Sequence, residues 1–115
     1  MPRYRYRGTF RSFRAQVNFF RERFGGAVTL VRVGRYYELF DAEARMAAAE
    51  LGLKLKERAR GMSCAAGFPA RFLQGYVNRF LAFGCDLAMV EEAPMRGEFV
   101  KERYVKEIYR IKRGE

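Results

Sequence analysis

Apolar residues along the chain recur with two spacings, one typical of helices and one typical of strands. Between Ser12 and Phe24, Phe and Val side chains return every three or four positions, which predicts an amphipathic helix with its arginines in solvent. A second helix is predicted from Asp41, a favourable N-cap residue, to Leu51, because Gly52 then ends it. Runs rich in β-branched residues, or alternating in polarity, predict strands over 27–33, 36–40, 53–57, 63–68, 86–90 and 103–111.

Pro69 suits the first turn of a third helix, which Gly84 ends. The predicted order of elements is therefore α-β-β-α-β-β-α-β-β. This order favours an α/β (α+β) fold in which a single mixed β-sheet carries about three packed helices. At 115 residues the chain suits one domain, predicted over 12–115, after a basic N-terminal arm over 1–11. The buried stripe of the third helix is predicted to contain Phe72, Tyr76, Val77 and Phe80.

Basic residues dominate the start of the chain. The net charge is +10, and residues 1–35 hold nine arginines against one acidic residue, Glu22, whereas the remainder is nearly balanced. Such one-sided charge favours a polyanionic partner that meets the N-terminal third of the chain, although a merely solvated basic surface is the alternative. Residues 1–9, where Arg and Tyr alternate, are interpreted as a phosphate-gripping arm, a disordered tail or an edge strand.

The sequence gives little support for enzyme chemistry. The sequence has no histidine, which excludes His-based acid–base catalysis, and two cysteines without histidine cannot form an ordinary zinc site. Cys64 and Cys85 are predicted to be buried thiols, with a disulfide as the alternative. Asp86, Glu91 and Glu92 make a poor metal-nuclease cluster, because adjacent strand residues point to opposite faces. We therefore predict a non-enzymatic protein without a cofactor or a metal.

The segment 33–40 carries the most informative pattern. Strand alternation places Tyr37 and Leu39 on one face and Tyr36 and Glu38 on the other. If the first pair lies in the core, an aromatic ring and a carboxylate project together into solvent. A carboxylate on a phosphate-seeking surface must overcome repulsion from phosphates, which indicates that it reads something other than a nucleic-acid backbone. The alternative is an ordinary strand with an exposed tyrosine and a solvated glutamate.

Four short motifs follow one another between residues 13 and 111. They are Gly34 to Phe40, then Ala66-Gly67-Phe68-Pro69 with Gly75-Tyr76-Val77 and Arg79, then Gly84 to Glu91, and finally Arg110-Ile111. Their order and spacing resemble domain I, the mismatch-recognition domain at the N-terminus of MutS proteins, and the chain is expected to be a stand-alone version of it. The family motif G-D-F-Y-E-L-F has its Phe replaced here by Tyr36 and its Asp by Arg35, and the family's Pro-x-His stands as Pro69-Ala70-Arg71.

The resemblance implies roles for individual residues. In the family, the aromatic side chain wedges into the minor groove and stacks on a mispaired base, and the glutamate hydrogen-bonds to that base. Tyr36 is therefore expected to be the wedge and Glu38 the base-contacting carboxylate. The other DNA-binding residues expected around them are Gly34, Arg35, Arg32 and Arg71, and the arginines at 32 and 35 are expected to contact phosphate.

The resemblance also implies a partner, which is double-stranded DNA that is mismatched or kinked. The sequence has no glycine-rich phosphate loop, so we expect no ATPase in the chain itself, and either a homodimer or a separate repair ATPase as a further partner. Two other functions stay open: a general DNA- or RNA-binding protein without mismatch preference, and an adaptor that docks on another repair protein. No apolar run reaches the length of a membrane span, so a cytoplasmic, nucleoid-associated protein without membrane contact is expected.

Overall fold

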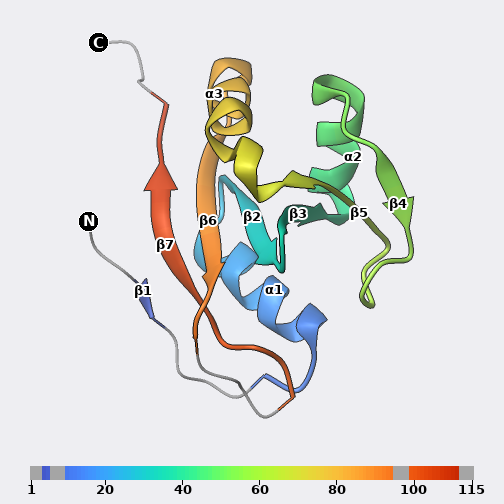
Figure 1. Ribbon diagram of the computed structural model, residues 1–115, viewed down its shortest axis with the longest axis vertical. Helices are drawn as coiled ribbons and strands as arrows, with labels where there is room; N and C mark the ends of the chain where they lie inside the picture. Colours follow the sequence, from blue (N-terminus) through green and yellow to red (C-terminus); the bar gives the residue numbers. More distant parts are fainter. Residues whose placement is uncertain (1–3, 6–9, 95–98, 112–115) are drawn as a thin grey trace.

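The computed structural model describes residues 4–5, 10–94 and 99–111. Within these residues the strands form one mixed sheet with helices on both faces (Figure 1), so the predicted fold of one mixed sheet and three packed helices is confirmed. The helices are α1 (Phe13–Arg23), α2 (Asp41–Leu51), the short 3₁₀-helix η1 (Ala70–Phe72) and α3 (Leu73–Phe83). The strands are β1 (Tyr4–Arg5), β2 (Ala27–Val33), β3 (Tyr36–Phe40), β4 (Leu55–Glu57), β5 (Cys64–Pro69), β6 (Asp86–Glu92) and β7 (Arg103–Tyr109).

The strands lie in the order β1-β7-β6-β2-β3-β5-β4. β2 and β6 are parallel, and the other neighbouring pairs are antiparallel. β2 and β3 have the predicted bounds, because the chain turns at Gly34, whose φ of 61° suits glycine. β4 begins at Leu55 and β7 ends at Tyr109, so both are shorter than their predicted ranges.

Part of the N-terminal arm belongs to the sheet. Tyr4 and Arg5 pair with Val105 and Tyr104 of β7 in antiparallel orientation. The edge-strand interpretation therefore holds for these two residues. Residues 1–3 and 6–9 lie outside the described residues, and the prediction of a phosphate-gripping arm rests largely on them.

The core has one layer on each side of the sheet. Leu39 of β3 packs in a cluster that contains Ala47 of α2 and Phe80 of α3. Phe40, the next residue, packs in a second cluster with Phe20 of α1. Because successive strand residues point to opposite faces, α1 covers one face and the α2–α3 pair covers the other. Figure 1 shows α1 crossing the lower part of the sheet, with α2 and α3 at its upper end.

The start of α2 differs from the prediction. The N-cap is Phe40, and Asp41 adopts a left-handed backbone with a φ of 57°. The Asp41 carboxylate accepts hydrogen bonds from the backbone N–H and the hydroxyl of Ser63 at 2.8 and 2.7 Å, and it pairs with Arg21 at 2.9 Å. Burial raises the pKa of Asp41, but these donors outweigh burial and lower the pKa to about 2. Asp41 therefore joins α1, α2 and the start of β5 instead of capping its own helix.

The start of the third helix also differs from the prediction. Pro69 ends β5, and the 3₁₀ turn η1 intervenes before α3 begins at Leu73. Phe72 is 49% exposed, so its predicted place in the buried stripe is wrong, whereas Val77 and Phe80 are buried as predicted. A 3₁₀ turn advances three residues per turn, and this places Phe72 away from the face that α3 buries.

The two cysteines are free thiols, which excludes the alternative of a disulfide. Cys64 is buried as predicted, whereas Cys85 is partly exposed. The described residues contain no helix that is long and apolar enough to cross a membrane.

Candidate nucleic-acid interface

Tyr36 is the first residue of β3 and stands on the α1 side of the sheet. Tyr36 is 49% exposed, whereas Tyr37, which points to the other face, is 2% exposed. The predicted alternation is therefore confirmed for both tyrosines. The sheet presents an aromatic ring to solvent at the point where the chain leaves the β2–β3 turn.

Glu38 shares the face of Tyr36 but does not project into solvent, so the expectation of a solvated carboxylate is wrong. The residue is 8% exposed, and its carboxylate pairs with the Arg60 guanidinium at 3.2 Å. Gly67 lies directly opposite Glu38 on β5. A Cβ at Gly67 would lie 2.6 Å from the Tyr37 carbonyl oxygen and 3.0 Å from Cγ of Glu38. The glycine therefore provides the space in which the Glu38 side chain lies.

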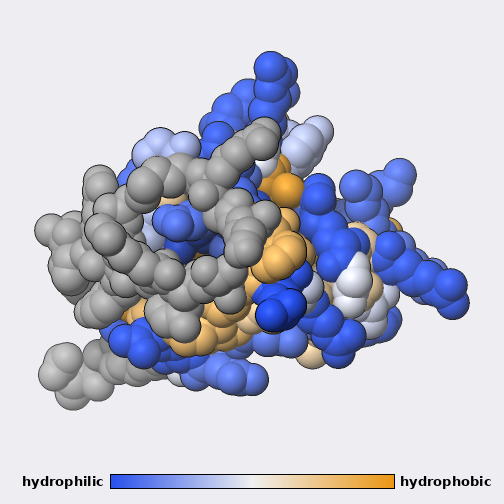
Figure 2. All heavy atoms as spheres, turned by 90° about the horizontal axis from the view of Figure 1, so that it is seen from below, coloured by the Kyte–Doolittle hydropathy of each residue, from blue (hydrophilic) through white to orange (hydrophobic). Residues whose placement is uncertain are grey.

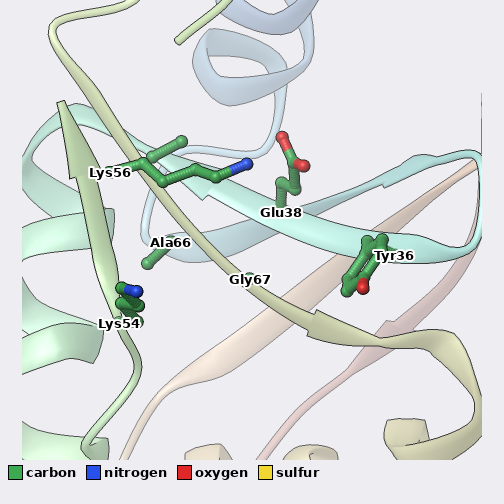
Figure 3. A pocket seen from close by; sticks show the side chains of 7 residues that line it. Tyr36, Glu38, Lys54, Lys56, Ala66 and Gly67 are labelled. Atoms are coloured by element: carbon green, nitrogen blue, oxygen red, sulfur yellow. The ribbon is translucent and has the colours of Figure 1, made fainter. Parts of the chain in front are cut away.

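A groove of about 360 Å³ runs beside Tyr36 and Glu38. Its floor is formed by small residues of β5, and long side chains from β3 and from the segment at β4 rise on either side. In Figure 3 the Lys56 amino group and the Glu38 carboxylate point toward one another across β5, and Tyr36 lies further along β3. We call this site the Tyr36 groove; it is lined by Tyr36, Glu38, Lys54, Lys56, Ala65, Ala66 and Gly67.

The cations near Glu38 come from the β4–β5 hairpin. A second hollow of about 410 Å³, which shares Glu38 and Lys56 with the Tyr36 groove, is also lined by Arg58 and Arg60. Basic residues occupy every second position from 54 to 60, and this spacing is the signal that sequence analysis used only to predict a strand. Figure 2 views the molecule from below Figure 1, and hydrophilic side chains project on its right, the side where β4 lies in Figure 1.

The turn of this hairpin is unusual in its backbone. Arg58, Arg60 and Gly61 all have positive φ, of 54°, 56° and 78°. Residues other than glycine seldom adopt this conformation, and it often marks functional segments. Two backbone hydrogen bonds hold the turn, from Arg58 N–H to the Ser63 carbonyl at 3.0 Å and from Met62 N–H to the Ala59 carbonyl at 2.8 Å.

Arg32 does not join Tyr36, although sequence analysis expected both at one site. Arg32 lies opposite Tyr37 in the β2–β3 register, which places its side chain on the other face of the sheet. Its guanidinium pairs with Glu91 at 3.4 Å and donates to the Gly34 carbonyl at 2.6 Å. The Tyr37 hydroxyl donates to Glu91 at 2.7 Å; burial, and then this hydrogen bond, raise the pKa of Tyr37 to about 12.

The turn that presents Tyr36 is held by a network of charged groups. The Gly34 N–H donates to the Glu92 carboxylate at 2.9 Å, and Glu92 also pairs with Arg103 at 3.3 Å. Arg103 is 6% exposed and donates to the Arg32 carbonyl at 3.0 Å. Glu91 and Glu92 therefore position this turn, and no metal-binding cluster of acidic residues is found in the described part of the chain.

Arg35, Gly34 and Arg71 lie near this turn and are exposed. The Ala70 N–H donates to the Arg35 carbonyl at 2.8 Å, which ties η1 to the β2–β3 turn. The Arg71 guanidinium lies 4.8 Å from the centre of the Phe72 ring. The structure thus brings Gly34, Arg35 and η1 together beside Tyr36, and it places Arg32 on the opposite face of the sheet.

Nearly the whole sequence of the chain matches one known family. The model of the family described as MutS domain I matches residues 11–111. The chain belongs to the MutS domain I family. The resemblance inferred from the four motifs is therefore confirmed.

Curated relatives of the chain are DNA mismatch repair proteins MutS. The chain is 34% identical over 80 residues to the protein of Cytophaga hutchinsonii and 35% identical over 75 residues to that of Dehalococcoides mccartyi strain BAV1. It is 34% identical over 73 residues to that of Chlamydia muridarum. These matches cover 67%, 63% and 64% of this chain but 9% of each relative, so the chain corresponds to a small part of those MutS proteins.

Proposed function

We propose that this MutS domain I chain binds double-stranded DNA and favours duplexes that are mismatched or distorted. The observation that supports the proposal is the half-exposed ring of Tyr36, which lies beside the β2–β3 turn and lines a groove that also contains lysines. The names of the relatives, DNA mismatch repair protein MutS, support the same ligand. The role is recognition, and we assign no reaction to the domain.

The charge of the surface suits a phosphate backbone. Lys54, Lys56, Arg58 and Arg60 line the two adjoining hollows, and the chain as a whole carries a net charge of +10. Each phosphate that is neutralised by such a cation releases condensed counterions, which gives affinity that falls steeply with salt. This part of the binding does not depend on sequence or on base pairing. Discrimination has to come from the ring and the carboxylate between these cations.

Tyr36 supplies the means of discrimination. Insertion of an aromatic side chain between base pairs costs a few kcal/mol of unstacking, and stacking on a base returns about 1–3 kcal/mol. A mispaired base is already weakly stacked, so the cost is smaller at a mismatch than in intact duplex. The balance then favours mismatched DNA. Because the ring is half exposed in the free protein, insertion breaks no packing of the core.

The Glu38–Arg60 pair explains how a carboxylate is tolerated on this surface. While the guanidinium lies 3.2 Å from Glu38, the acid presents little negative charge to approaching phosphates. We propose that a phosphate near the hairpin pairs with Arg60 in place of Glu38, so that Glu38 becomes free to accept a hydrogen bond from a base. Arg60 is 44% exposed at its side chain and can reach such a phosphate.

The same ion pair favours a second candidate function, which is general DNA binding without mismatch preference. If Glu38 stays with Arg60 in the complex, no acceptor reaches the base, and the cations of the two hollows dominate the affinity. The two functions predict different responses to a single substitution. Tyr36→Ala removes the ring without changing the charge of the groove.

The test is a titration of matched, mismatched and single-stranded DNA at about 50 and 200 mM salt. Wild-type protein is expected to favour the mismatched duplex. Tyr36→Ala should erase that preference and leave the salt dependence unchanged, and Tyr36→Phe, which keeps the ring, should retain the preference. Equal affinity of the wild type for matched and mismatched duplex, with a steep salt dependence, would establish the general binder instead.

A further inference from the structure

A second surface with the chemistry of a nucleic-acid site lies at the start of α3. It is a hollow of about 460 Å³ that shares no lining residue with the Tyr36 groove. Its lining alternates aromatic rings with guanidinium groups. We call it the α3 platform; it is lined by Arg71, Phe72, Gln74, Gly75, Tyr76 and Arg79.

An arginine guanidinium lies against each aromatic ring of the α3 platform. The Arg71 guanidinium lies 4.8 Å from the centre of the Phe72 ring, and the Arg79 guanidinium lies 5.0 Å from the centre of the Tyr76 ring. Tyr76 in turn stacks on Phe68 of the core, with ring centres 4.2 Å apart and an interplanar angle of 15°. Since Phe68 is 2% exposed, this stack fixes Tyr76 to the core. The core therefore holds the Tyr76 side of the platform in place.

Phe72 is the ring that remains available to a ligand. It is 49% exposed, at the end of η1, directly before α3, whose buried residues Val77 and Phe80 pack in the core. An exposed phenylalanine costs solvation free energy that the fold does not require at this position. Exposed aromatic rings beside arginines are the surfaces on which successive bases stack in single-stranded nucleic acid.

The charge of the α3 platform matches the same ligand. Its lining contains two arginines and no carboxylate. Arg79 uses part of its guanidinium to donate to the Leu51 carbonyl at 2.6 Å, which holds the group in place over Tyr76. Arg71 is exposed, and its guanidinium lies against Phe72. A phosphate chain that crosses the platform would meet both cations while a base meets the ring.

The platform is attached to the turn that presents Tyr36. Pro69 lies opposite Tyr36 in the β3–β5 register, and the Ala70 N–H donates to the Arg35 carbonyl at 2.8 Å. Three residues of η1 thus connect the two surfaces.

We propose that the α3 platform binds single-stranded nucleic acid, with a base stacked on Phe72 and phosphates at Arg71 and Arg79. Stacking of this kind accepts any base, so the site reads the absence of pairing and not the sequence. It adds a second binding surface to the proposed duplex site. Its existence does not depend on whether Tyr36 discriminates mismatches.

The experiment measures binding of the full chain to an oligothymidylate of about ten nucleotides by fluorescence anisotropy at low salt. Phe72→Ala is expected to weaken binding at least about fivefold, the loss of one stacked base. Phe83→Ala is the matched control, because Phe83 is 48% exposed at the other end of α3 and lies outside the platform. It should bind like the wild type, and so should Tyr36→Ala.

Three results would overturn the proposal. The first is an oligothymidylate affinity that is the same for Phe72→Ala and Phe83→Ala. The second is a loss of matched-duplex affinity in Phe72→Ala as large as the loss for oligothymidylate, which would place Phe72 in the duplex site. The third is a loss of oligothymidylate binding in Tyr36→Ala, which would mean one shared site. If oligothymidylate binding follows Phe72 while mismatch preference is absent from the wild type, the duplex proposal fails and the platform stands.

Discussion

Replacing Gly67 by alanine tests how the sheet makes room for Glu38. An added Cβ would lie 2.6 Å from the Tyr37 carbonyl oxygen, a distance that real Cβ atoms do not tolerate, and 3.0 Å from Cγ of Glu38. The nearest atom belongs to the backbone of β3, so relief requires the two strands to move apart. Overpacking of this kind costs about 1–3 kcal/mol. For a domain of this size the melting temperature should fall by roughly 5–15 °C.

The matched control is the same substitution in α3. A Cβ at Gly75 meets nothing within 4 Å, and the residue lies in the helix, where alanine is favoured over glycine by about 0.5–1 kcal/mol. Gly67→Ala should therefore destabilise the domain in chemical denaturation, and Gly75→Ala should stabilise it. If Gly67→Ala unfolds at the wild-type denaturant concentration, the account of Glu38 burial is refuted.

Three further substitutions test the electrostatics. Burial raises the pKa of Glu43 to about 7, so the protonated side chain stabilises the fold below pH 4.5, and this contribution is lost as the pH rises through 7. Glu43→Gln should therefore flatten the dependence of stability on pH. At pH 8 the variant should be more stable than the wild type by up to about 3 kcal/mol in denaturant titrations. The pKa of Asp41 is lowered to about 2, so its carboxylate stabilises the fold above pH 3.8, and this contribution is lost as the pH falls through 2. Asp41→Asn should lower the free energy of unfolding by about 1–2 kcal/mol at pH 7 and by progressively less in acid. Lys56→Gln should reduce the slope of log affinity for duplex against log salt by about 0.9, whereas Lys106→Gln, an exposed lysine on β7, should leave it unchanged.

Local patterns were sufficient to predict most of the fold. The β-branched run of β2 and the turn at Gly34 determine two strands without help from distant residues. The exposed Tyr36 and the buried Tyr37 follow from strand alternation alone. Where an extra 3₁₀ turn interrupts the periodicity, as at Phe72, the prediction from spacing was wrong.

The electrostatic partners in the site could not be predicted in the same way. Burial of Glu38 depends on the missing side chain at Gly67 and on the Arg60 guanidinium, which the pairing of β3, β5 and β4 brings together. Arg32 has the composition of a phosphate contact, but β2 lies beside β6, and Glu91 is therefore within reach. Such pairings depend on strand order, which is not encoded in the spacing of charges along the chain.

The role of Tyr36 can be measured most directly with a fluorescent adenine analogue placed beside a mismatch, since its emission rises when the base is unstacked. At saturating protein, wild type and Tyr36→Phe should raise the emission in the mismatched duplex and leave it unchanged in the matched duplex. Tyr36→Ala, although bound, should raise it in neither. An equal rise with Tyr36→Ala, or no rise with bound wild type, would contradict insertion of the ring.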